Sequence, residues 1–90
     1  MSTLYLPLKA IYFDQIKAGT KMDEYRLVTS YWKKRIEDRS YKAIILTSGY
    51  PPRGDENRRL VRQWRGFEKI TLTHEHFGPS PVEVYAIRVN

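Results

Sequence analysis

The stretch Gly19-Thr20-Lys21-Met22-Asp23-Glu24-Tyr25-Arg26 decides how the rest of the chain is interpreted. It follows an amphipathic segment, residues 9–18, whose pattern predicts a helix. Gly19 stands where this helix is expected to end, because glycine adopts the left-handed cap conformation without a steric cost. After Gly19 the side chains alternate with the period of a strand. This alternation predicts that Glu24 and Arg26 share one face of the strand, within ion-pairing reach.

Three ionisable side chains of this stretch, Lys21, Glu24 and Arg26, follow the glycine turn closely. Such a group can bind a polar ligand. The same spacing is also typical of a surface strand with a solvated salt bridge. Lys21 falls on the face opposite Glu24 unless a turn or bulge at the start of the strand redirects it. Spacing alone therefore leaves both interpretations open.

Gly19, Lys21, Glu24 and Arg26 match the GxKxxExR motif of the ASCH domain, a relative of the PUA RNA-binding barrel. Further segments are similar to a short ASCH subgroup of bacterial and phage genomes: Leu6-Pro7-Leu8-Lys9, Tyr12-Phe13, Ile16, Tyr31-Trp32-Lys33-Lys34-Arg35-Ile36 and Gly49-Tyr50-Pro51. The resemblance covers roughly residues 4–66. It implies a small PUA-like β-barrel with a cleft beside the first helix that receives RNA or a nucleobase.

Carried onto this chain, the resemblance assigns ligand binding to Lys21, Glu24 and Arg26. Lys21 offers a point charge for a phosphate, or a base if a dry pocket lowers its pKa. Glu24 can accept a hydrogen bond from the exocyclic amine of cytosine, adenine or guanine, or act as a general base. Arg26 can hold Glu24 in place or bind phosphate through its planar fork. If the protein is an enzyme, Lys21 and Glu24 are its candidate catalytic residues.

Whether the protein is an enzyme stays open at this point. Some ASCH proteins resemble amidohydrolases that remove an acyl group from a modified cytidine with a threonine nucleophile, a lysine and a separate glutamate. Here Glu24 stands where that threonine is expected, which is a departure from the pattern. Other ASCH proteins are reported to cut single-stranded RNA. His74, His76, Glu24 and Lys21 can supply the acid and base for that reaction, but their spacing does not show that they converge.

The positive charge of the chain is concentrated in its middle. The net charge is +6, of which residues 26–42 contribute +4 and residues 53–66 contribute +3. Such a patch indicates a phosphate-bearing partner. The side chains expected to follow a nucleic-acid backbone are Lys33, Lys34, Arg53, Arg58, Arg59, Arg62 and Arg65. The prediction is therefore an RNA- or nucleobase-binding module, with a small hydrolase of RNA or modified nucleosides, or a phage-type factor that binds an acidic host protein, as alternatives.

Composition excludes several other classes of protein. The chain has no cysteine, so it forms neither disulfides nor a thiolate metal site. His74 and His76 lack an evident third ligand, so no metal or other cofactor is expected. The first residues do not resemble a signal peptide, and no apolar run is long enough to span a membrane. We therefore expect a cytoplasmic protein with no membrane partner.

The remaining pattern predicts a single α+β domain over residues 1–90, with five to six mixed or antiparallel strands and two short helices. The further elements are expected at residues 3–8, 21–28, 41–48, 58–66, 68–76 and 82–89 for the strands and 31–38 for the second helix. The helix residues expected to pack inward are Ile11, Tyr12, Phe13, Ile16, Tyr31, Trp32 and Ile36. Tyr50, in the long loop 49–57, either stacks on a base or plugs the end of the barrel.

Overall fold

The chain folds into strands and helices in the order that the sequence predicts, and a computed structural model describes them over residues 2–90. The elements are β1 (Thr3–Leu8), α1 (Ala10–Lys17), β2 (Asp23–Leu27), α2 (Ser30–Ile36), β3 (Ala43–Ser48), the short helix η1 (Glu56–Arg58), β4 (Arg59–Gln63), β5 (Phe67–Leu72), the short helix η2 (Glu75–Phe77) and β6 (Val82–Arg88). The predicted α+β class, with six strands and two α-helices, is confirmed.

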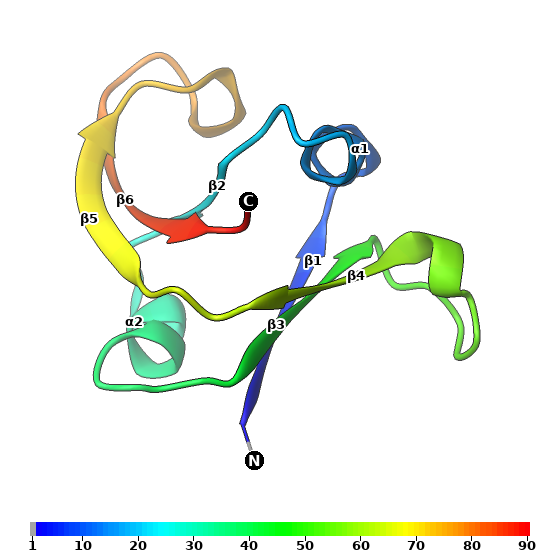
Figure 1. The fold of residues 1–90 in the computed structure, drawn as a ribbon. Coiled ribbons are helices and arrows are strands. Elements are labelled where there is room, and N and C mark those ends of the chain that lie inside the picture. Colours follow the sequence, from blue (N-terminus) through cyan, green and yellow to red (C-terminus); the bar gives the residue numbers. More distant parts are fainter. Residues whose placement is uncertain (1) are drawn as a thin grey trace.

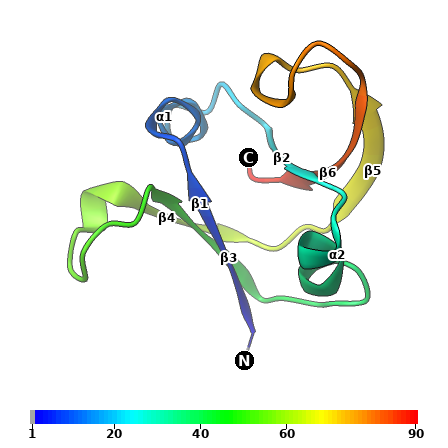
Figure 2. The ribbon, with the colours of Figure 1, turned by 180° about the vertical axis from the view of Figure 1, so that it is seen from behind.

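The strands pair into two three-stranded sheets. In the first sheet the order is β1-β3-β4, with β1 parallel and β4 antiparallel to the central β3. In the second sheet β6 lies between β2 and β5 and is antiparallel to both. Figures 1 and 2 show α1 and α2 apart from each other, with the last residues of the chain in the middle of the molecule. Closure of the two sheets into one barrel stays a prediction.

Both sheets contribute to one hydrophobic core. Leu4, Leu6 and Leu8 alternate inward from β1 as expected, and β1 tolerates Pro7 because it is an edge strand that needs no ladder donor there. The other buried members come from both helices, from β3, from β6 and from the residue after β6: Phe13, Ile16, Ile36, Ile44, Leu46, Tyr85, Ile87 and Val89. The helices are therefore held by the core that the two sheets share.

Two of the inward-facing predictions for the helices are wrong. Ile11 is 59% exposed and Tyr31 is 55% exposed. Each helix buries only a narrow stripe, Phe13 with Ile16 in α1 and Ile36 in α2. Because successive helical residues are about 100° apart, Ile11 lies on the opposite side of α1 from Phe13. The same geometry turns Tyr31 outward from the side of Ile36.

The boundaries of both helices follow from their caps. Gly19 has a φ of 81°, in the left-handed region expected for the residue that ends α1. The hydroxyl of Thr29 accepts a hydrogen bond of 3.2 Å from the backbone N–H of Trp32 and so caps the start of α2. These two caps fix the ends of β2, which lies between the helices.

The predicted end of the strand 68–76 is wrong. β5 stops at Leu72, and the chain then turns into η2. The loop 49–57 extends beyond the sheets (Figure 1), and Tyr50 within it is 87% exposed, so it does not plug a barrel.

None of the helices formed by residues 2–90 has the length and apolar character needed to cross a membrane.

Candidate functional site

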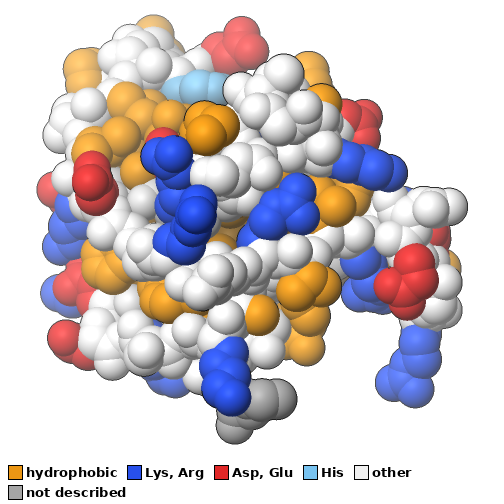
Figure 3. Space-filling model, in the orientation of Figure 1, with side chains coloured by type: hydrophobic (Ala, Val, Ile, Leu, Met, Phe, Trp, Pro, Cys, Tyr) orange, Lys and Arg blue, Asp and Glu red, His pale blue; other side chains and the backbone are white. Residues whose placement is uncertain are grey.

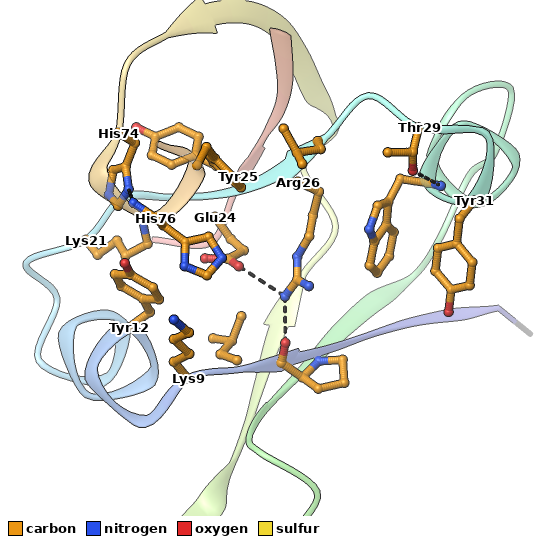
Figure 4. A pocket seen from close by; sticks show the side chains of 15 residues that line it. Lys9, Tyr12, Lys21, Glu24, Tyr25, Arg26, Thr29, Tyr31, His74 and His76 are labelled. Atoms are coloured by element: carbon orange, nitrogen blue, oxygen red, sulfur yellow. Dashed lines mark hydrogen bonds and ion pairs between the residues drawn. The ribbon is translucent and has the colours of Figure 1, made fainter. Parts of the chain in front are cut away.

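A cavity of about 360 Å³ opens between α1, β2, α2 and η2. Figure 4 shows the motif residues on its floor, with side chains from both ends of the chain around them. Its lining consists of Pro7, Leu8, Lys9, Tyr12, Lys21, Glu24, Tyr25, Arg26, Leu27, Thr29, Tyr31, Trp32, His74, His76 and Phe77. All three motif residues predicted to bind a ligand therefore line the same cavity.

The floor of the cavity is an ion pair. Arg26 Nη2 lies 3.0 Å from Glu24 Oε2, and the two side chains are 17% and 8% exposed. The prediction that they share a face of the strand is confirmed. Arg26 Nη2 also donates a 2.7 Å hydrogen bond to the Pro7 carbonyl, and its guanidinium lies 4.9 Å from the centre of the Trp32 ring. Arg26 Nε is the one buried side-chain polar atom within residues 2–90 that has no hydrogen-bond partner.

For both Glu24 and Arg26, burial shifts the pKa more than their mutual attraction does. Desolvation raises the pKa of Glu24 above its ordinary value, although the charges of Arg26 and Lys21 oppose the shift. Desolvation likewise lowers the pKa of Arg26, against the charge of Glu24. An ion pair whose two charged forms are both disfavoured contributes little to folding. The ion pair between Glu24 and Arg26 is therefore weak evidence for a purely structural role.

Lys21 reaches the cavity because it precedes β2 and is not part of the strand. Its Nζ lies 4.5 Å from the centre of the Tyr25 ring and 5.4 Å from that of Tyr12. The Asn90 side-chain amide donates to the carbonyls of Ile16 (2.9 Å) and Lys21 (2.7 Å) and so fixes the turn. The turn thus redirects Lys21 toward Glu24, which is the exception that the sequence left open.

Two histidines complete the wall opposite the floor. In η2 the backbone N–H of His76 donates to His74 Nδ1 at 3.1 Å, and both rings lie less than 6 Å from that of Tyr12, at 5.7 and 5.8 Å. Burial lowers the pKa of His76, and the charges of Lys9, His74 and Arg26 act in the same direction. Residues 2–90 contain no group of three side chains suited to hold a metal ion. The turn formed by η2, and not the predicted strand 68–76, places the two histidines beside each other.

The cavity is aromatic and carries a net positive charge. Its aromatic lining residues are Tyr12, Tyr25, Tyr31, Trp32 and Phe77. Lys9, Lys21 and Arg26 supply three cations against the single carboxylate of Glu24. Flat rings beside cations suit a planar, anionic ligand, because the ring faces stack while the cations bind its charge.

The arginines predicted to follow a nucleic-acid backbone do not line the cavity. Four of them donate to backbone carbonyls: Arg58 to Ser48 (2.7 Å), Arg59 to Pro51 and Pro52 (3.2 Å each), Arg62 to Val89 (3.0 Å) and Arg65 to Asn90 (3.3 Å). Lys33, Lys34 and Arg53 are exposed. Figure 3 shows basic side chains spread over one face among acidic and apolar groups.

Sequence reasoning missed several residues of the site. Tyr12 and Trp32 were assigned to the core, and Lys9, Tyr25 and Phe77 received no role. A signal existed only for Lys9, which lies directly between β1 and the helix that precedes the motif. The others reach the cavity through contacts between distant segments.

Comparison with known proteins adds no relative, because no family model, curated protein or solved structure matches the chain.

Proposed function

We propose that the protein is an RNA-binding module whose cavity holds one nucleobase of a single strand, in the manner of a PUA-like ASCH domain. The observation that carries this proposal is the buried Glu24 carboxylate on the floor of an aromatic, cation-lined cavity. A volume of about 360 Å³ is near the small end of the range for ligand pockets and suits one nucleoside.

The base and the phosphate of a nucleotide each have candidate partners in the cavity. Ionised Glu24 accepts a hydrogen bond from an exocyclic amine, which selects cytosine, adenine or guanine over uracil. Tyr12, Tyr25 and Trp32 provide ring faces or edges against which the base packs. Lys9 and Lys21 neutralise the phosphate. The exposed Lys33, Lys34 and Arg53 then act at longer range on the RNA backbone.

The experiment is fluorescence anisotropy of labelled single-stranded RNA, duplex RNA and DNA at low and physiological salt. We expect single-stranded RNA to bind best and to bind more weakly as salt increases. Lys21→Ala, and Glu24→Gln if circular dichroism shows that it is folded, should reduce the affinity. Glu68→Gln is the control, because Glu68 is an exposed carboxylate of β5 outside the cavity. Absence of binding to every nucleic acid at low salt would overturn the proposal and leave an acidic protein as the partner to test.

Hydrolysis is a second candidate, because Lys21, Glu24, His74 and His76 line one cavity. The pKa of His76 is lowered, which favours the neutral imidazole that accepts a proton, and the pKa of Glu24 is raised, which favours the carboxylic acid that donates one. Gel analysis of the same RNA samples, and incubation with an acylated cytidine, test this candidate. Cleavage that Lys21→Ala abolishes would identify an enzyme, whereas intact RNA and intact cytidine would leave the binding module.

A further inference from the structure

A second hollow of about 400 Å³ adjoins the cavity, between β1, α2 and the loop 49–57. We call it the groove. It is lined by Thr3, Leu4, Tyr5, Pro7, Arg26, Tyr31, Trp32, Arg35, Tyr41 and Tyr50. Four of these residues, Pro7, Arg26, Tyr31 and Trp32, also line the cavity. The groove and the cavity are therefore neighbours that share one wall.

Arg26 is the centre of the shared wall. Its guanidinium is held by the Pro7 carbonyl at 2.7 Å and lies 4.9 Å from the centre of the Trp32 ring. A third contact, with Glu24, ties it to the cavity floor. Its Nε is buried without a partner. A cation between two hollows is well placed for a phosphate that joins two nucleosides.

The groove gathers the exposed tyrosines of the protein. Within residues 2–90 three tyrosines are among the large hydrophobic side chains that remain exposed: Tyr5 (60%), Tyr31 (55%) and Tyr50 (87%). All three line the groove, although they come from β1, α2 and the loop 49–57. Their convergence from separate elements makes a stacking surface that folding leaves uncovered.

The charge of the groove matches that of a phosphate backbone. Arg26 and Arg35 line it, and no aspartate or glutamate of residues 2–90 does. The Arg35 guanidinium lies 3.5 Å from the centre of the Tyr31 ring and donates a 2.9 Å hydrogen bond to the Tyr31 carbonyl. Arg35 is therefore held over one face of the Tyr31 ring at the groove, where its charge suits the phosphate of a nucleotide.

We infer that the groove binds the nucleotide next to the one in the cavity, so that the ligand is a single strand of at least two nucleotides and not a free nucleoside. This inference rests on the proposed function. One base enters the cavity above Glu24, the linking phosphate lies against Arg26, and the next base stacks among Tyr5, Tyr31 and Tyr50. A duplex is excluded, because paired bases present no free ring faces to side chains.

The test compares a mononucleotide, AMP, with the dinucleotide ApA and with ApA that lacks its second base, by isothermal titration calorimetry or competition anisotropy. For the unmodified protein we expect ApA to bind about tenfold or more tightly than AMP, as one added stacking contact provides. The abasic dinucleotide should lose most of this gain, because its linking phosphate remains but its second base is gone.

The variants act only on the groove. Tyr5→Ala and Tyr50→Ala should remove the gain from the second nucleotide and leave AMP binding unchanged, since neither residue lines the cavity. Tyr50→Phe should retain the gain, because it keeps the ring. Val61→Ala is the control for an exposed apolar residue outside both hollows.

Equal binding of AMP and ApA, or a gain that survives Tyr5→Ala and Tyr50→Ala together, would overturn the inference and leave the proposed function intact. Failure of every nucleotide and RNA to bind would overturn both. Because Tyr50 is almost fully exposed, its replacement keeps the test valid even if Tyr5→Ala proves poorly folded.

Discussion

The Glu24 carboxylate lies 3.0 Å from the Arg26 guanidinium on one face of β2, with little access to solvent for either group. The pKa of Glu24 is raised and that of Arg26 is lowered, in each case chiefly by burial. The attraction between them does not offset the removal of both charges from water. Such a pair contributes little to the stability of a small domain, and it lies where a ligand gains from prearranged charges.

The first prediction concerns the stability of this pair. Glu24→Gln alone should lower the free energy of unfolding by up to about 3 kcal/mol, because it leaves the Arg26 charge without a partner. The double variant Glu24→Leu/Arg26→Met should be as stable as the unmodified protein or more stable, and should not bind RNA. Urea denaturation measures both effects. If the double variant is clearly less stable than the unmodified protein, the pair stabilises the fold and our account of it is wrong.

The second prediction concerns pH. Only the ionised form of Glu24 accepts a hydrogen bond from a base amine, so affinity for cytidine or adenosine nucleotides should rise as pH increases through its raised pKa. Stability should change in the opposite direction. Because the folded-state pKa lies above the ordinary value of 4.5, the contribution of Glu24 is fully present below 4.5 and is lost as pH rises through the raised value.

Comparison of the unmodified protein with Glu24→Gln separates the pH dependence of stability that Glu24 causes from that of the other carboxyls. Hydrogen bonds from Tyr85 and Lys69 lower the pKa of Glu37, so its stabilising effect is lost only as pH falls below 4.5. The difference between the two proteins above pH 4.5 therefore reports Glu24. We expect RNA affinity to rise and melting temperature to fall as pH increases above 4.5. If both change in the same direction, Glu24 is not the group responsible.

The third prediction concerns Asn90, whose side-chain amide holds the turn that carries Lys21. Asn90→Ala removes two hydrogen bonds, to the carbonyls of Ile16 and Lys21. Each is worth about 1 kcal/mol, and for a domain of this size each kcal/mol lowers the melting temperature by about 4–8 °C. RNA affinity should fall as well, because Lys21 is no longer fixed over the cavity. Asn57→Ala, an exposed replacement, is the matched control.

The role of Asn90 shows where sequence reasoning stops. The shared face of Glu24 and Arg26 follows from strand periodicity, and the Thr29 cap follows from local chemistry, so both were predictable. The direction of Lys21 depends on a residue far along the chain. Short-range patterns contain no information on such a contact. The tyrosines of the groove illustrate the same limit, since their elements meet only in the folded chain.

The positions of the histidines and arginines also could not be predicted from the sequence. Alternation suggested that His74 and His76 continue β5, but η2 interrupts it and places both rings beside Tyr12 of α1. The arginines of residues 53–65 counted equally toward the basic charge of the sequence. The structure distinguishes them, because Arg62 donates to the Val89 carbonyl and Arg53 is exposed. Composition gives the charge but not the partner.

The last prediction uses this difference between two arginines of equal charge. Arg62→Ala removes a partly buried 3.0 Å hydrogen bond and leaves the Val89 carbonyl without that donor. It should lower stability by about 1 kcal/mol and the melting temperature by about 4–8 °C. The dependence of RNA affinity on salt should barely change, because this guanidinium is engaged within the protein. Arg53→Ala should leave the melting temperature unchanged, since Arg53 lies exposed in the loop 49–57.

If Arg53 binds the RNA backbone, its removal should reduce the slope of log affinity against log salt by about 1. Arg53→Lys keeps the charge and should keep the slope, which separates loss of charge from disturbance of the loop. Arg62→Ala would contradict this assignment if it left the melting temperature unchanged and reduced the slope of log affinity against log salt. Arg62 would then belong to the nucleic-acid surface, and its contact with Val89 would contribute nothing to the fold.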